Sequence, residues 1–178
     1  MTRLSRGIAA AAVLAGFALA GCGAQPGAAA VVDGERITES ELARAVEDFA
    51  AVTGQQVEAA MMLGTLVVAP SLIEVGAEYG VGASDDEAAA LLDRQAEMAG
   101  LPVPEGGYGE GVLRVAKMTI VNQGLSASPD GARAAEEINE QISQIDVEVS
   151  PRYGEFDPSG QIVQEPLPWI ASEQVPVQ

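Results

Sequence analysis

The chain contains one cysteine and no histidine, which leaves few side chains able to act as a nucleophile or a general base near neutral pH. The cysteine is Cys22, and it ends the run Leu19-Ala20-Gly21-Cys22. Small residues before a cleavage point are typical of a site where a signal peptidase holds the backbone closely. We therefore expect the chain to be cut before Cys22, which leaves the thiol at the new N-terminus.

The residues before Cys22 have the parts of an export signal. Arg3 and Arg6 are followed by an apolar run, 8–20, that is shorter than the about 20 residues needed to span a bilayer. Residues 19–22 resemble the lipobox of bacterial lipoproteins at all four positions. The resemblance implies that the Cys22 thiol receives a diacylglyceryl group and that the new amine is acylated. The alternative is a buried helix that carries a cysteine by chance.

Two short segments at the N-terminus are therefore set apart from the fold. We expect residues 1–21 to be a signal peptide and residues 22–29 to be a lipidated tether rich in glycine and alanine. The anchor implies a location on the extracytoplasmic face of the cell membrane.

The acidic clusters are the remaining candidates for chemistry. Residues 85–87 (Asp-Asp-Glu) fall where a helix is expected to begin, and acids there complement the helix dipole. We interpret residues 136–137 (Glu-Glu) as solvated and 157–160 (Asp-Pro-Ser-Gly) as a β-turn, since the latter lacks the pattern of a calcium loop. The sequence thus predicts no catalytic site, no metal site and no cofactor, and a protein that is not an enzyme.

The charge balance excludes some partners. The formal net charge of −17 becomes −19 once Arg3 and Arg6 leave with the signal, because all 26 acidic residues lie beyond residue 21. Such a domain is expected to repel nucleic acid and anionic lipid headgroups. The same charge can keep a protein with an apolar binding surface in solution.

The N-terminal half of the domain predicts a hairpin followed by helices. Asp33-Gly34 lies between two short apolar-flanked runs within 30–37, as in a two-residue β-hairpin. Residues 38–41 (Thr-Glu-Ser-Glu) form a capping box and predict a helix that ends near Gly54. A second helical stretch is expected over 55–68, with Pro70 breaking or kinking it before a further segment to about residue 79. The expected inward residues of the first helix are Leu42, Ala45, Val46, Phe49 and Val52.

The C-terminal half predicts more helices and one strand. A second capping box at 84–87 predicts a helix through Met98 with Leu91, Leu92 and Met98 inward and Gly100 as its stop. A helix over 112–123 should end at Gly124, and Ser128-Pro129 should start another that runs to about residue 144 with Ala135, Ile138, Ile142 and Ile145 inward. Residues 146–150 alternate like a half-buried strand.

The fold class that follows is mostly α (α+β), with five or six helices and a small sheet formed by the N-terminal hairpin and the C-terminal strand. A lone hairpin is marginally stable, so the late strand is expected to pair with it. The segment after residue 150 is turn-rich, and residues 166–178 form a proline-rich tail that contains Trp169.

Three segments resemble the N-terminal domain of SurA, PrsA and trigger-factor-related chaperones. They are AVVDGERITESELARAV at residues 30–46, AEYGVGASDDEAAAL at 77–91 after a Leu-Ile pair, and DVEVSPRYGEFDPSG at 146–160. The resemblance spans about 30–165, and the three segments occur in the family's order. Over this stretch the chain is similar to SurA N-terminal-domain lipoproteins of high-GC Gram-positive bacteria. Pro70 and Ser150 depart from the family pattern. We expect no parvulin isomerase domain of the kind that many relatives carry, because few residues lie outside this stretch and none is a histidine that could form its site.

The resemblance implies a membrane-anchored chaperone-like protein that binds unfolded exported polypeptides and has no isomerase activity. Methionines adapt to irregular partners, so candidate peptide-binding residues are Met61 and Met62, with Val67 and Leu72 beside Pro70. Core packing is the alternative role for each. The alternative function is a lipoprotein scaffold that binds one dedicated folded envelope partner.

Overall fold

A computed structural model describes residues 26–163, and its first element is the hairpin expected from the Asp-Gly pair. Strands β1 (Ala28–Val32) and β2 (Glu35–Thr38) pair antiparallel. Asp33 has a φ of 48° and Gly34 a φ of 84°, as a type I′ turn requires at both positions. Strand β3 (Val147–Val149) pairs antiparallel with the other edge of β1, which gives the order β2-β1-β3. The predicted pairing of the late strand with the hairpin is therefore confirmed.

The first helix begins and ends where its capping residues predict. Helix α1 (Glu39–Thr53) has Thr38 as its N-cap, and the Glu41 amide donates to the Thr38 hydroxyl over 3.1 Å. The Glu41 carboxylate lies 3.8 Å from Arg114 of a later helix. Gly54 ends α1 with a φ of 69°, a conformation that glycine adopts without steric cost.

The expected interruption at Pro70 is wrong. Helix α2 (Ala59–Glu78) starts four residues after Gln55, where the helical stretch was expected to begin, and it continues through Pro70. A proline inside a helix costs about 3 kcal/mol, so the flanking turns must supply the stability. They do so through buried side chains on both sides of Pro70, while Pro70 itself is exposed. The buried residues of these turns are Leu66, Val67, Ala69, Ser71 and Val75.

Helix α2 is also long and apolar enough to cross a membrane, with a mean hydropathy of 1.7 over most of its length. Half of that stretch is buried inside the protein, as in the central helix of a folded domain.

Helix α3 (Asp85–Met98) has a complete capping box, as its sequence predicts. The Glu87 amide donates to the Ser84 hydroxyl over 3.2 Å, and the Ser84 amide donates to the Glu87 carboxylate over 2.8 Å. This backbone bond to Ser84 lowers the pKa of Glu87. Gly100 follows the helix with a φ of 70°. The expectation for Met98 is wrong, because it is 80 % exposed and the inward face is formed by Ala88, Leu92 and Ala96.

Helix α4 (Glu110–Ala127) passes through Gly124 and does not end there. A Cβ at Gly124 would overlap the Cγ1 of Val81, so this glycine serves the close packing of α4 against the turn after α2. Helix α5 (Gly131–Gln144) starts three residues later than Ser128, with Asp130 as its N-cap. Its buried residue is Ala134 and not the expected Ala135, which is exposed, while Ile138 and Ile142 are half-buried.

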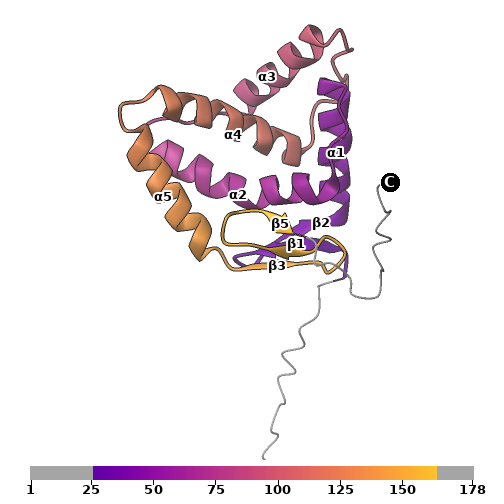
Figure 1. Cartoon of the computed structure of the whole chain (residues 1–178). Helices are drawn as coiled ribbons and strands as arrows, with labels where there is room; N and C mark the ends of the chain where they lie inside the picture. The colour runs from indigo at the N-terminus through magenta and orange to yellow at the C-terminus, as the bar shows by residue number, and fades with distance from the viewer. Residues whose placement is uncertain (1–25, 164–178) are drawn as a thin grey trace, which may run out of the picture.

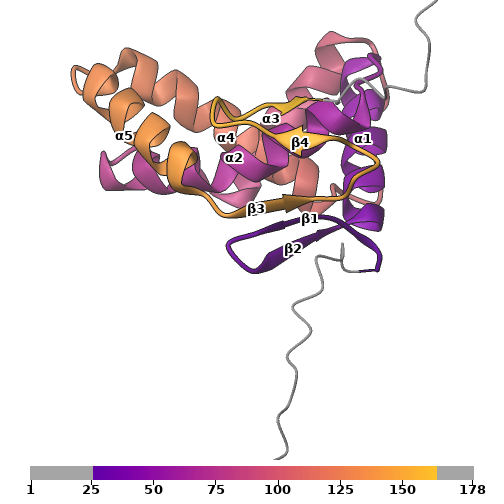
Figure 2. The same cartoon turned by 60° about the horizontal axis from the view of Figure 1, so that its bottom comes forward.

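The elements surround α2 on several sides (Figure 1). Helix α4 runs along α2 on one side, the sheet covers the opposite side, and α1 and α5 cross its two ends. A short hairpin of β4 (Glu155–Phe156) and β5 (Ile162–Val163) follows β3, with β4 beside β3 and β5 against α2 (Figure 2). Within residues 26–163, the mostly helical fold with five helices and a small sheet is as predicted. The β4–β5 hairpin is not anticipated by the sequence.

Candidate functional site

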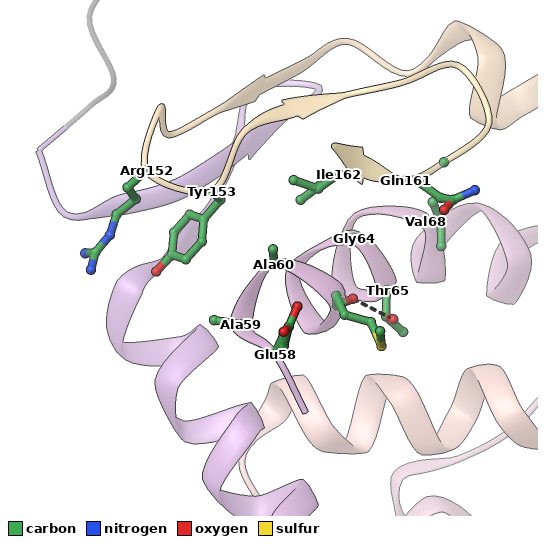
Figure 3. A pocket seen from close by; sticks show the side chains of 12 residues that line it. Glu58, Ala59, Ala60, Gly64, Thr65, Val68, Arg152, Tyr153, Gln161 and Ile162 are labelled. Carbon is green, nitrogen blue, oxygen red and sulfur yellow. Dashed lines mark hydrogen bonds between the residues drawn. The ribbon is translucent and has the colours of Figure 1, made fainter. Parts of the chain in front are cut away.

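A groove of about 630 Å³ separates the first half of α2 from the chain that follows β3 (Figure 3). Its α2 side carries residues 58–61, Gly64, Thr65 and Val68, and its other side carries 152–153 and 160–162. We refer to this space as the α2 groove. Pockets of this size accommodate a few side chains of a peptide.

One wall of the α2 groove is built from small residues at a spacing of four. Ala60, Gly64 and Val68 share a face of α2, as residues at i and i+4 do on any helix. Ile162 of β5 faces them across the groove (Figure 3). A Cβ placed on Gly64 would lie 3.8 Å from the Gly160 carbonyl oxygen, so the hairpin comes close to α2 at this point. The wall carries small apolar residues, and at Gly64 the hairpin already lies in contact with it, so the open part of the groove lies elsewhere along α2.

The opposite wall depends on the turn between β4 and β5. The Asp157 carboxylate accepts hydrogen bonds from the Ser159 hydroxyl (2.6 Å), the Ser159 amide (2.9 Å) and the Gln161 amide (3.0 Å). The Gly160 amide donates to the Asp157 carbonyl over 3.0 Å, which confirms the β-turn expected for these residues. These donors, the Ser159 hydroxyl first, lower the pKa of Asp157 from its ordinary value of 3.8.

This turn should loosen in acid. A carboxylate whose pKa is lowered by folding stabilises the folded turn above its unfolded pKa, and that stabilisation is lost as the pH falls through the lowered value. We expect the amide chemical shifts of Ser159 and Gln161 to titrate together with a midpoint below 3.8, measured by NMR. The Asp157→Asn variant should abolish this titration. A midpoint at or above 3.8 in the natural chain would contradict the bonding described here.

The rim next to β3 is tied to the start of α1. Arg152 lies 3.2 Å from the Glu39 carboxylate, and the Tyr153 hydroxyl donates to the same group. Burial, together with the bond to Glu39, raises the pKa of Tyr153. The Arg152 guanidinium points away from Ala60 and Gly64 (Figure 3). The positive charge on this rim is therefore already engaged by a carboxylate outside the groove.

The other rim is the start of α2. Glu58 is the N-cap residue, but its side chain makes no capping hydrogen bond. Met61 follows within the first turn and is 65 % exposed. This rim therefore offers an exposed flexible apolar side chain next to a carboxylate.

The four candidate peptide-binding residues do not share one surface. Met61 lines the α2 groove, whereas Met62 and Val67 are 3 % and 1 % exposed and belong to the core beneath the sheet. Leu72 is half-buried against the cluster where α2 meets α4 and α5. Adjacent residues such as Met61 and Met62 point about 100° apart on a helix, so they cannot both face the same groove. Of the four candidates, the α2 groove therefore includes Met61, while Met62 and Val67 have the core-packing role that was the alternative.

The groove residues that sequence reasoning missed are Ala60 and Gly64 on α2 and Ile162 on β5. The spacing of Ala60, Gly64 and Val68 was a signal for a close-packed face. Nothing local to Ile162 indicates that it returns to α2, since about a hundred residues separate them.

The acidic clusters have structural partners. Asp85 lies 2.5 Å from Lys117, and Glu87 completes the capping box of α3. Glu137 accepts from the Tyr79 hydroxyl over 3.1 Å, and its hydrogen bond and charge raise the pKa of Glu78. Within residues 26–163, no group of three or more acidic, histidine or cysteine side chains is arranged to hold a metal ion.

Cys22, the expected signal peptide at 1–21 and the tail from residue 166, including Trp169, lie outside the described residues. Comparisons with family models, with curated proteins and with solved structures find no match to this chain.

Proposed function

We propose that this protein is a membrane-anchored, extracytoplasmic chaperone-like protein that binds unfolded exported polypeptides without isomerase activity. The observation that carries the proposal is the α2 groove, which is open, has a mixed polar and apolar lining with apolar side chains on its α2 side, and is bordered by the exposed Met61. An extended peptide could place apolar side chains against Ala60, Met61 and Val68 without meeting a fixed hydrogen-bonding pattern. Such binding selects for apolar character and not for a particular sequence.

Two further features support a holding role. An apolar wall with few hydrogen-bond requirements should bind weakly, at about micromolar Kd or about −8 kcal/mol, which allows release. The net charge of −19 after signal removal should keep loaded copies apart, and this effect should weaken as salt screens it. The expected lipid on Cys22 would hold the protein where exported chains emerge.

The second candidate is a scaffold for one folded envelope partner, and a different surface favours it. Met98 at the end of α3 is 80 % exposed, and Val103 in the following loop is 39 % exposed. These two exposed apolar side chains lie five positions apart in the chain, and contiguous exposed apolar surface is typical of a protein-binding site. This pair is not part of the α2 groove.

The two candidates predict opposite effects for two matched methionine substitutions. In Met61→Gln, apolar contact in the groove is lost while the core is untouched, so binding to denatured clients should weaken by about 1 kcal/mol, or about fivefold in Kd. Met98→Gln removes a methionine that is still more exposed and lies elsewhere, and it should leave client binding unchanged. The measurement is light scattering of several unrelated denatured exported proteins, with peptide Kd values by fluorescence anisotropy.

Both variants should keep the melting temperature of the natural chain, because both side chains are exposed. If neither the natural chain nor Met98→Gln slows aggregation of any client, the chaperone proposal fails. If Met98→Gln instead abolishes capture of a single envelope protein, the scaffold function takes its place.

A further inference from the structure

We propose that the C-terminal segment of this same chain, residues 164–178, occupies the α2 groove when no client is bound, with Trp169 as its anchor. The part of this inference that concerns competition with clients rests on the function proposed above. Occupancy of the groove by the segment stands on its own.

The first argument is where the chain leaves the described structure. Ile162 forms one wall of the α2 groove, and the next residue, Val163, ends β5 and is 47 % exposed. The fifteen residues that follow therefore start at the edge of the groove. Trp169 is six residues beyond Val163, a reach of about 20 Å for an extended chain.

The second argument is the composition of the segment. It reads QEPLPWIASEQVPVQ, with two acidic residues and no basic residue, in a protein that is otherwise rich in acids. Leu167, Trp169 and Ile170 supply three large apolar side chains within four positions. Pro166 and Pro168 restrict the backbone between them, which lowers the entropy lost when such a segment binds.

The third argument is the fit between a large ring and the groove wall. Ala60 is half-buried and lines the part of the α2 groove that no side chain among residues 26–163 fills, since this space remains open at about 630 Å³. Tryptophan carries a large apolar surface and one N–H donor. Thr65 and Gln161 on the walls offer oxygen acceptors for that donor.

The fourth argument is tethering. A segment joined to the groove by a few residues has an effective concentration in the millimolar range. Suppose that the separate peptide binds the groove with a Kd of about 0.1 mM. The tethered segment would then be bound about ten times more often than unbound. Clients would have to displace the segment, so their apparent affinity would fall by the same factor.

The chain has one tryptophan, so its fluorescence reports on this segment alone. The experiment uses the mature chain, residues 23–178, made without the lipid, and measures acrylamide quenching of Trp169. We expect quenching severalfold weaker than in a free peptide of residues 164–178, and independent of protein concentration. Ala60→Arg places a long charged side chain in the groove and should raise quenching to the level of the peptide.

Ala132→Arg is the matched control, since Ala132 is an exposed helical alanine on α5 outside the groove. It should leave the quenching weak, and both variants should melt like the natural chain. Quenching equal to that of the free peptide in the natural chain overturns the inference. Shielding of Trp169 that survives Ala60→Arg in a folded protein also overturns it. Shielding that appears only at high protein concentration overturns it as well, because a second copy would then supply the segment.

Client binding separates this inference from the proposed function. Trp169→Ser should strengthen binding of an unfolded client peptide by about tenfold, and added peptide 164–178 should compete with the client. If Trp169→Ser binds clients no better than the natural chain, the competition between segment and clients is refuted while the chaperone function stands. If Trp169 is shielded by the groove but neither protein binds any client, the chaperone function fails and the occupancy by the segment stands.

Discussion

Replacing Cys22 with alanine should leave unprocessed precursor or release the protein from the membrane fraction. Each buried CH₂ of an acyl chain contributes about 0.8 kcal/mol, so one chain binds a membrane marginally and two or more hold it stably. The variant can receive neither the thioether-linked lipid nor, after cleavage, the amine-linked one. The measurement is cell fractionation followed by an immunoblot that separates precursor from mature protein.

The neighbouring Gln25→Ala variant is the control for this experiment, because it alters the tether without removing the thiol. It should be processed and retained like the natural chain. Normal processing together with full membrane retention of Cys22→Ala would refute the interpretation of residues 19–22 as a lipidation signal.

Gly76→Ala should destabilise the domain by about 1–3 kcal/mol. Gly76 lies in the second half of α2, where a Cβ would overlap the Cγ1 of Val121 on α4 and lie 2.8 Å from the Val81 carbonyl oxygen. Val121 is fully buried, and the Val81 amide donates to the Gly76 carbonyl over 2.7 Å, so both neighbours are held in place. For a domain of this size the melting temperature should fall by about 2–10 °C.

Gly64→Ala is the matched control in the same helix. A Cβ at Gly64 would meet its nearest neighbours at 3.8 Å, which is ordinary contact, and alanine favours a helix interior over glycine by up to about 1 kcal/mol. Gly64→Ala should therefore be neutral or stabilising in urea or thermal unfolding. Equal destabilisation by both substitutions would mean that helix conformation, and not the contact between α2 and α4, decides the cost.

Several elements could be predicted because their causes are local. The Asp33-Gly34 turn needs positive φ at both residues, and few other pairs adopt it so readily. Thr38 and Ser84 bond to amides three residues ahead, so their helices start where these residues stand. The strand at 147–149 follows from alternation and from the instability of a lone hairpin.

The errors occur where distant contacts outweigh a local preference. Pro70 favours a helix break, but the buried turns on both sides of it keep α2 continuous. Gly124 favours a helix end, but the approach of Val81 requires a glycine inside α4. Met98 was expected inward because it is apolar, yet it lies past the last turn of α3 that packs on the core.

The sequence by itself determined the export and lipidation signal as an expectation, the acidic surface, the absence of histidine and thiols from the mature domain, and the fold class. These depend on residue type or on spacing over a few positions, so no tertiary contact is needed to read them. Tertiary structure decided the candidate site. The α2 groove exists because β5 returns to α2 across about a hundred residues, and because the helix turns Met61 outward and Met62 into the core. Which face of a helix is covered depends on what packs against it, and that is set by the fold as a whole.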